Sequence, residues 1–227
     1  MSLNDVILYL ARFLVLLFIL PAHEFAHAFA AYKNGDNTAK YSVRYTLNPL
    51  KHFDLIGLVC FLIAGFGWAK PVPVNPYNFK DYKKGCFWVS IAGVLTNYSL
   101  AFLFYPLFYL SVTFLPVNYF TEFIVTVFYC GYVLDLSFFV VNLIPVYPLD
   151  GFRLLDTFVK KRGSIYNFLR KYGYYVLIGL ILLSSMVGNN TNLSFLNIFG
   201  YLMKFATNVV GYPIAKFWQL IFSLFLG

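Results

Sequence analysis

Residues 6–32 read VILYLARFLVLLFILPAHEFAHAFAAY, an apolar run that is interrupted by one arginine, one proline and the ionisable residues His23, Glu24 and His27. The run is long enough for a helix to cross a bilayer, which takes about 20 residues. On a helix, side chains four positions apart lie one above the other on the same face, so His23 and His27 project together. The run therefore predicts a membrane helix with two imidazoles on one face.

The H-E-F-A-H sequence at residues 23–27 has the spacing of a zinc-binding helix. Two imidazoles one turn apart can take two tetrahedral positions on one zinc ion, and Glu24 beside them is placed to take a proton from a metal-bound water. Soluble helices also carry this short pattern by chance. A membrane segment makes that explanation weak, because a charge at the bilayer centre costs about 2.5 to 3.5 kcal/mol on insertion scales. We therefore expect one Zn²⁺ per chain.

The composition is that of a multi-pass membrane protein. Of the 227 residues, 60% are hydrophobic and only 11% are charged. No polar stretch is long enough to form a soluble domain, so we expect residues 1–227 to form a single all-α membrane domain. Its catalytic core should cover about residues 6–160, and its C-terminal membrane segments about 172–227. The net charge is +8, and the basic residues fall in loops between apolar segments. They do not form a surface of basic and aromatic side chains of the kind that binds single strands, which argues against nucleic acid binding.

Hydropathy predicts a bundle of about four to six transmembrane helices. The expected spans cover about residues 6–32, 87–115, 121–143 and 172–187. The tail from residue 195 onward is compatible with one broken span or with two short interfacial helices. The first apolar segment lacks a basic leader and a small-residue cleavage site, so we expect it to be retained rather than removed as a signal peptide.

Two stretches are expected to depart from helix. The apolar run 55–69 is short and contains Gly65 and Gly67, which favours a re-entrant element between the first and second spans. The sequence K-P-V-P-V-N-P that follows at residues 70–76 suits a short extended, β-like edge segment, because proline cannot donate to a central ladder. The prolines and glycine of N-L-I-P-V-Y-P-L-D-G, residues 142–151, should unwind the end of the third span beside a cavity.

The distribution of Lys and Arg predicts the orientation. Eight lie between Lys33 and Lys84, six lie between Arg153 and Lys171, and the turns near residues 116–120 and 188–194 contain none. If the apolar run at residues 55–69 does not cross the bilayer, both basic stretches lie on the same side of the membrane. By the positive-inside rule that side is the cytoplasm, and the N-terminus is outside. The histidine motif and Asp150 then lie at similar depth, nearer the cytoplasmic face.

A catalytic zinc usually has three protein ligands and one open position. The carboxylates and the remaining histidine supply the candidates for the third ligand, which are His52, Asp54, Glu122, Asp135, Asp150 and Asp156. His52 and Asp54 lie in a basic loop, where solvation or capping is the simpler role. Asp156 suits an ion pair, and Glu122 suits a helix N-terminus. We favour Asp150, which follows the unwound stretch, and Asp135 in the middle of the third span remains the rival.

Several motifs together resemble the compact prokaryotic branch of the site-2 protease family of intramembrane zinc metalloproteases. They occur in the family's order over about residues 20–155, and they read H-E-F-A-H, G-D-N-T-A-K, T-L-N-P-L, G-F-G-W-A-K-P-V-P-V-N-P, A-G-V-L-T-N and N-L-I-P-V-Y-P-L-D-G. Val94 and Phe152 depart from residues that are frequent in the family, and neither position carries a ligand.

The resemblance implies a function and a set of site residues. His23, His27 and Asp150 match the zinc ligands, and Glu24 matches the general base. Asn97, Asn142, Gly65 and Gly67 match positions that are associated with substrate or with the element that presents it as a strand.

The implied activity is hydrolysis of a peptide bond in or near a transmembrane segment, as in regulated intramembrane proteolysis. The implied setting is a prokaryotic plasma membrane, so the partners are the lipid bilayer and a membrane-spanning protein substrate.

A metal-binding membrane transporter or sensor is the alternative, because His and Asp on neighbouring spans also form metal pathways. Transport usually needs polar groups across the whole membrane. Here the polar groups cluster near one face, with little beyond Asp135 to continue them.

Overall fold

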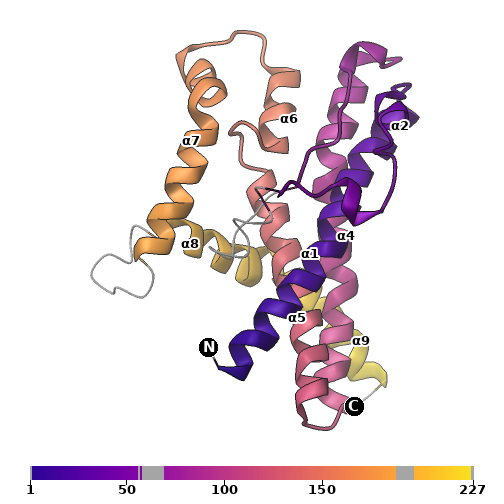
Figure 1. Cartoon of the computed structure of the whole chain (residues 1–227), viewed down its shortest axis with the longest axis vertical. Coiled ribbons are helices and arrows are strands. Elements are labelled where there is room, and N and C mark those ends of the chain that lie inside the picture. The colour runs from indigo at the N-terminus through magenta and orange to yellow at the C-terminus, as the bar shows by residue number, and fades with distance from the viewer. Residues whose placement is uncertain (1, 56, 58–68, 188–196, 226–227) are drawn as a thin grey trace.

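The computed structural model describes residues 2–55, 57, 69–187 and 197–225, apart from the side chain of residue 185, and its regular elements are helices. Their order is α1 (Leu3–Lys33), α2 (Thr38–Tyr41), η1 (Pro49–Lys51), η2 (Pro76–Asn78), α4 (Tyr82–Phe114), α5 (Tyr119–Asn142), α6 (Asp150–Phe158), α7 (Ser164–Val187), α8 (Ile198–Phe205), η4 (Ala206–Val210) and α9 (Tyr212–Phe225). Figure 1 shows α1, α4 and α5 together as the long axis of the molecule.

Within the described residues, three helices are long and apolar enough to cross a membrane, namely α1, α4 and α5. They contact one another pairwise, and α5 turns back along α4 (Figure 1). Their bounds confirm the first three predicted spans to within a few residues, although α4 begins five residues earlier than expected. The total of four to six spans stays a prediction.

Side-chain caps explain where these helices begin. The Ser2 hydroxyl accepts from the Asp5 N–H at 3.2 Å, and the Asp5 carboxylate accepts from the Ser2 N–H at 2.7 Å, which forms a capping box. The Asp81 carboxylate accepts from the Lys84 N–H at 3.0 Å at the start of α4. Each cap satisfies an amide that has no partner inside its helix. The cap at Asp81 accounts for the earlier start of α4.

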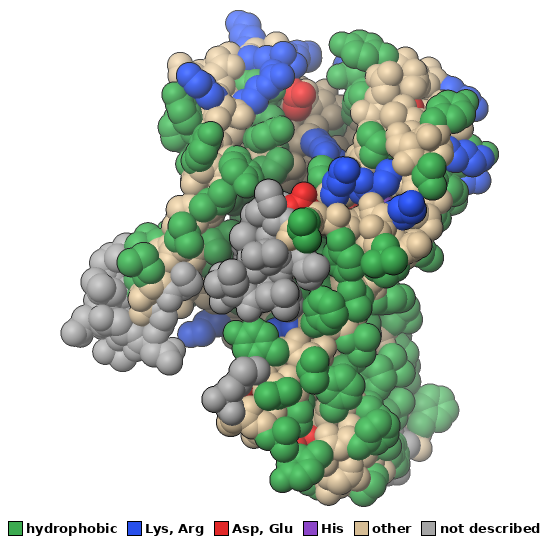
Figure 2. Space-filling model, in the orientation of Figure 1, with side chains coloured by type: hydrophobic (Ala, Val, Ile, Leu, Met, Phe, Trp, Pro, Cys, Tyr) green, Lys and Arg blue, Asp and Glu red, His purple; other side chains and the backbone are tan. Residues whose placement is uncertain are grey.

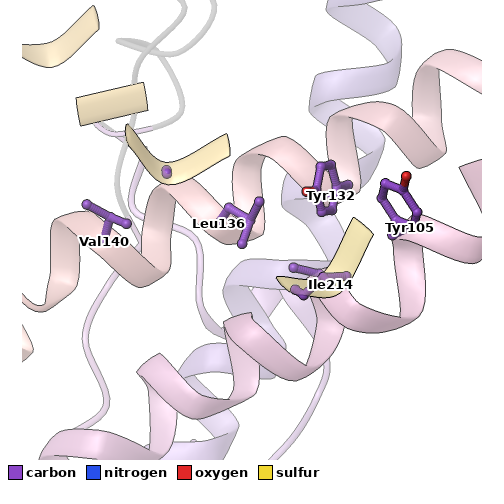
Figure 3. Close-up of a cluster of buried hydrophobic side chains, with 7 residues drawn as sticks. Tyr105, Tyr132, Leu136, Val140 and Ile214 are labelled. Carbon is purple, nitrogen blue, oxygen red and sulfur yellow. The ribbon is translucent and has the colours of Figure 1, made fainter. Parts of the chain in front are cut away.

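Two buried clusters hold the bundle together. Ala11, Val15 and Ile19 lie four residues apart on α1 and pack against Cys130 of α5. A second cluster joins α4 and α5 to the C-terminal elements η4 and α9. Its buried members are Ala101, Tyr105, Tyr132, Leu136, Val140, Ala206 and Ile214, several of which are labelled in Figure 3. The tail beyond residue 197 thus consists of two helices and an intervening π turn packed on the bundle.

The chain is irregular from Leu143 to Leu149, between α5 and α6, as the prolines predicted. Helix α6 then begins at Asp150, with Gly151 against the preceding turn. A Cβ on Gly151 would lie 2.3 Å from the Leu143 carbonyl oxygen. Only a residue without a side chain allows this approach, and it turns the start of α6 back toward the bundle.

The segment from Ala69 to Asp81 lies against the end of α1. Lys70, Val72 and Asn75 each precede a proline, which disfavours helix and holds them extended. A single antiparallel bridge joins Phe53 to Ala69, and the described residues otherwise contain no named strand. The predicted re-entrant element lies almost wholly outside the described residues, as do Gly65 and Gly67.

Asp36 fixes this segment to the turn that follows α1. Its carboxylate accepts from the Asn75 N–H at 2.8 Å, the Asn78 amide at 2.7 Å and the Thr38 N–H at 3.0 Å. Burial alone raises the pKa of the Asp36 carboxyl, but the hydrogen bonds from Thr38, Asn78 and Asn75 lower it below its usual value. The ionised carboxylate is therefore the form that holds the segment.

Basic side chains gather at one end of the molecule. Figure 2 shows most of the visible Lys and Arg at the end that carries α2, α6 and the start of α7, while hydrophobic side chains cover the opposite end. The C-terminal end of α1 and the start of α6 lie at this basic end (Figure 1).

Candidate metal centre

The two histidines come from the last third of α1 and face the interior of the bundle. His23 is 8% exposed and His27 is 2% exposed. Their Nε2 atoms lie 3.0 Å apart, as expected for side chains one helical turn apart. Local helix geometry is sufficient to bring these two nitrogen atoms together.

Asp150 reaches the histidines from α6. Its Oδ2 atom lies 3.3 Å from Nε2 of His23 and 3.1 Å from Nε2 of His27. The carboxyl group is buried, and its other oxygen lies 3.6 Å from the Arg153 guanidinium. Within the described part of the chain, His23, His27 and Asp150 form the group of ligand-type residues that could hold a metal ion.

Hydrogen bonds at the far side of each ring define its tautomer. Nδ1 of His27 lies 2.7 Å from the Val89 carbonyl oxygen, and Nδ1 of His23 lies 3.3 Å from Oδ1 of Asn97. A carbonyl oxygen only accepts, so Nδ1 carries the proton in both rings and both Nε2 atoms present lone pairs. Val89 and Asn97 belong to α4, so the second long helix orients both imidazoles.

Three acceptor atoms therefore converge at the centre without a donor between them. The Asp150 oxygen that faces the histidines has no hydrogen-bond partner within the described residues. Ligand atoms about 2.0–2.1 Å from a tetrahedral zinc ion are about 3.3 Å apart, close to the 3.0–3.3 Å measured here. The donor set thus fits Zn²⁺, with two imidazole nitrogens and one carboxylate oxygen.

Gly93 of α4 packs directly on this centre. A Cβ at this position would lie 2.5 Å from both Cε1 of His23 and Nε2 of His27. Those distances are shorter than any real Cβ contact, so a side chain there would displace the imidazoles. The glycine of the A-G-V-L-T-N motif therefore makes room for the metal centre.

Glu24 lies on the same helix and contacts the extended segment. Its Oε2 atom accepts from the Val72 N–H at 2.8 Å. Val72 is the first valine of P-V-P-V, so the backbone of the extended segment lies beside the carboxylate. This hydrogen bond and the buried cluster that Val72 shares with Ala28 make the segment a neighbour of the H-E-F-A-H helix.

The structure distributes the other predicted site residues differently. Asn97 is 1% exposed, and its contact with His23 is a hydrogen bond between α4 and α1. Asn142 is half-buried and ends α5, at the opposite end of the irregular turn from Asp150.

The rival ligands lie outside the cluster. Asp135 is fully buried within α5, and neither of its carboxyl oxygens has a hydrogen-bond partner among the described residues. Asp156 pairs with Arg162 at 3.0 Å, and Glu122 lies in the first turn of α5, as the sequence predicted.

Asp54 accepts from the Gly57 N–H at 2.9 Å, a capping contact. The expectation that His52 is solvated is wrong. His52 is 1% exposed, and its Nε2 donates to the Thr46 carbonyl oxygen at 2.7 Å. Burial lowers the pKa of His52 in spite of that hydrogen bond, so the neutral ring is favoured. The loop folds over this histidine instead of exposing it.

Sequence reasoning missed three contributors, namely Gly93, the Val89 carbonyl and the Val72 N–H. Backbone groups leave no signature in side-chain chemistry, so the latter two were not recognisable in advance. Gly93 had a signal, because a glycine four residues before Asn97 on the same helix lies on the same face.

Comparisons with known proteins find a family and relatives that match most of the chain. The model of "Peptidase family M50" matches residues 11–186. The chain is 38% identical over 169 residues to "Putative zinc metalloprotease YwhC" of Bacillus subtilis (strain 168), a match that covers 74% of this chain and 77% of that protein. It is 31% identical over 147 residues to "Putative zinc metalloprotease Rip2" of Mycolicibacterium smegmatis (strain ATCC 700084 / mc(2)155), covering 60% of this chain and 52% of that protein. No solved structure matches the chain significantly.

Proposed function

The chain belongs to peptidase family M50, and from this membership we propose that it is an intramembrane zinc metalloendopeptidase of the H-E-x-x-H type. Its reaction is hydrolysis of a peptide bond in or near a transmembrane segment of a membrane protein, as in regulated intramembrane proteolysis. The observation that carries the proposal is that Asp150, at the start of α6, meets His23 and His27 of α1, a helix long and apolar enough to span a membrane.

His23, His27 and Asp150 hold one zinc ion per chain. When bound, zinc would supply a Lewis acid that polarises the scissile carbonyl and makes a water molecule acidic enough to react near neutral pH. Asn97 and the Val89 carbonyl keep both imidazoles in the tautomer that presents Nε2. The Arg153 guanidinium holds the second oxygen of Asp150.

Glu24 acts as the general base. Its carboxylate takes a proton from the attacking water and passes it to the leaving amine as the peptide bond breaks. The Val72 N–H holds one oxygen of this carboxylate and leaves the other available for proton transfer. Glu24 is half-buried, which limits the competing solvation of its charge.

The extended segment presents the substrate. A peptide within a helix has its carbonyl groups in hydrogen bonds, so the scissile stretch must unwind before attack. Strand addition along residues 70–75 would hold it open next to Glu24. Gly65, Gly67 and Asn142 remain the proposed substrate-side positions, whereas buried Asn97 supports His23 instead.

The whole chain acts as one membrane-embedded domain, with its core at about residues 6–160. Its setting is a prokaryotic plasma membrane that it crosses several times. The gathering of basic residues at one end supports an active site nearer the cytoplasmic face. The partners are the lipid bilayer and a protein with a transmembrane segment.

Metal analysis of the purified protein tests the ligand set. We expect one zinc per chain in the parent and in Glu24→Gln, and loss of zinc in His23→Ala and in Asp150→Ala. Glu24→Gln should cleave a membrane-spanning substrate about 100 to 10,000 times more slowly, because it removes the general base. Full zinc content in Asp150→Ala would overturn the ligand assignment, and parental cleavage by Glu24→Gln would overturn the role of the base.

A further inference from the structure

A pocket of about 210 Å³ lies near the candidate metal centre. It is bounded by the extended segment, the first turns of α4 and residues 153–157 of α6. Figure 1 shows α6 alongside the upper end of α4. Its lining includes Val72 and Val74 from the segment, Val89 from α4, and Arg153 from α6. A cavity of roughly 150 Å³ can hold benzene, so this one has room for a leucine or phenylalanine side chain.

Three lining residues also contact groups of the proposed catalytic site. The Val72 N–H donates to Glu24, the Val89 carbonyl accepts from His27, and Arg153 pairs with Asp150. The pocket therefore shares its walls with the base and with two of the metal ligands. His23, Glu24, His27 and Asp150 do not line the pocket themselves, so a group that entered it would be separated from them by these wall residues.

The side chains on one face of the extended segment point into the pocket. Side chains two residues apart on an extended chain point to the same face, and both Val72 and Val74 line the pocket. A peptide paired along the segment would place alternate side chains over that face. One of them would enter the pocket while the backbone lay beside Glu24.

The lining contains several uncharged polar residues, but most of its buried side chains are apolar, which favours an apolar group. Val72, Val89 and Phe79 are buried wall residues that belong to hydrophobic clusters. The two charged residues of the lining already have partners, since Asp156 pairs with Arg162 at 3.0 Å and Arg153 pairs with Asp150. No unpaired charge of the described lining is available to stabilise a charged substrate side chain.

We propose that this pocket binds the side chain of the substrate residue that adjoins the scissile bond, and that it selects a leucine- to phenylalanine-sized apolar group. This inference rests on the proposed peptidase function, and it names a feature of the substrate. The resulting preference is for cleavage beside a large apolar residue.

Peptide hydroxamates provide the test, because the hydroxamate binds zinc in place of the scissile carbonyl. Two series carry glycine, leucine, phenylalanine, lysine or aspartate next to this group, before it in one series and after it in the other. Binding is measured on the zinc-loaded full-length protein in detergent. In one series we expect leucine and phenylalanine to bind about 10 to 100 times more tightly than glycine, and lysine and aspartate to gain nothing.

Two changes that fill the pocket should remove this advantage. Thr157 of α6 lines the pocket, so the larger side chain of Thr157→Phe would fill it. The Thr157 hydroxyl donates only to the carbonyl four residues earlier in the same helix. Thr126 makes the same local hydrogen bond on α5, which makes Thr126→Phe the matched control. Cys86 also lines the pocket, and methyl methanethiosulfonate can modify it in folded protein that carries Cys60→Ser and Cys130→Ser.

Thr157→Phe and the modified Cys86 should each lower leucine binding to the level of glycine, with glycine binding unchanged, whereas Thr126→Phe should keep the full difference. Equal binding of glycine and leucine in both series would overturn the pocket and leave the zinc site intact. An advantage of leucine that survives both changes would also overturn it. Failure of the glycine compound to bind zinc-loaded protein would refute the proposed function itself.

Discussion

Gly93 lies where α4 crosses the two histidines, and its missing side chain determines how closely the helices approach. The nearest atoms to a Cβ built there are ring atoms of His23 and His27. Those rings cannot move aside freely, because Val89 and Asn97 hold their far nitrogens. The hydrogen atom that Gly93 carries in place of a methyl group therefore leaves room for both imidazole rings.

We expect Gly93→Ala to weaken zinc binding by about 5- to 150-fold, since overpacking a tight site costs about 1 to 3 kcal/mol. Gly179→Ala is the control, because a Cβ at Gly179 of α7 meets no described atom within 4 Å. Competition with a chelator measures zinc affinity in both variants. Parental affinity in Gly93→Ala would show that the helices can separate without cost.

The extended segment, residues 70–75, is the element that holds the carboxylate of Glu24, the proposed base. Its prolines exclude helix, but they also remove backbone donors that a sheet would use. The segment is held instead by the Asp36 carboxylate near Asn75, by Glu24 at Val72, and by Arg44, which donates to the Lys70 carbonyl oxygen. Its position therefore depends on charged side chains from two other parts of the chain.

Asp36→Asn should release this segment, because it removes the charge and one acceptor oxygen. The protection factor of the Asn75 amide in hydrogen exchange should fall about 10- to 150-fold, as for loss of a hydrogen bond to a charged group worth about 1.5 to 3 kcal/mol. Asp81→Asn keeps an equally good helix cap and serves as the control. Unchanged protection of the Asn75 amide in Asp36→Asn would show that other contacts hold the extended segment in place.

The same contact gives a pH dependence with a definite sign. The folded-state pKa of Asp36 is lowered, so its stabilising effect is fully present above the unfolded value of about 3.9. It is lost as the pH falls through the lower folded-state value. Protection of the Asn75 amide should therefore decline in that acidic range in the parent, whereas Asp36→Asn should show no such step.

At the scale of the whole molecule, the C-terminal elements pack on the face of α4 and α5 away from the metal centre. The Tyr132 hydroxyl donates to the Gly211 carbonyl oxygen at 3.1 Å, and the Trp218 indole donates to the Phe102 carbonyl oxygen at 2.9 Å. Figure 3 shows Tyr132, Leu136 and Ile214 in this cluster. None of these residues contributes to the group His23, His27 and Asp150.

Gly211→Ala should therefore lower stability and leave zinc binding intact. Its Cβ would lie 2.2 Å from the Tyr132 hydroxyl and 2.7 Å from Cδ1 of Leu136. A cost of about 1 to 3 kcal/mol predicts a fall of about 2 to 12 °C in the unfolding midpoint. Gly163→Ala, where a Cβ meets no described atom within 4 Å, should not change it. Thermal denaturation with metal analysis measures both effects, and loss of zinc in Gly211→Ala would contradict this separation.

The sequence by itself determined the features that depend on local periodicity. Apolar runs long enough to span a bilayer predicted α1, α4 and α5, and the four-residue spacing predicted that His23 and His27 share a face. Prolines predicted the irregular end of α5 and the extended segment. The interrupted tail stayed ambiguous, because Lys204, Gly211 and Pro213 break the apolar pattern without showing which surface covers it.

Only the tertiary structure decided which distant groups meet. Asp150 lies beside the histidines because the turn after α5 folds back, and Asp135 lies elsewhere in the same bundle although its chemistry is the same. His52 is buried because a loop closes over it, which its polar neighbours do not reveal. Local sequence fixes the direction of a side chain relative to its own helix. The depth and rotation of one helix against another come from packing, which determines that Asp150 meets the histidines, that Gly93 lies against them and which residues form the pocket.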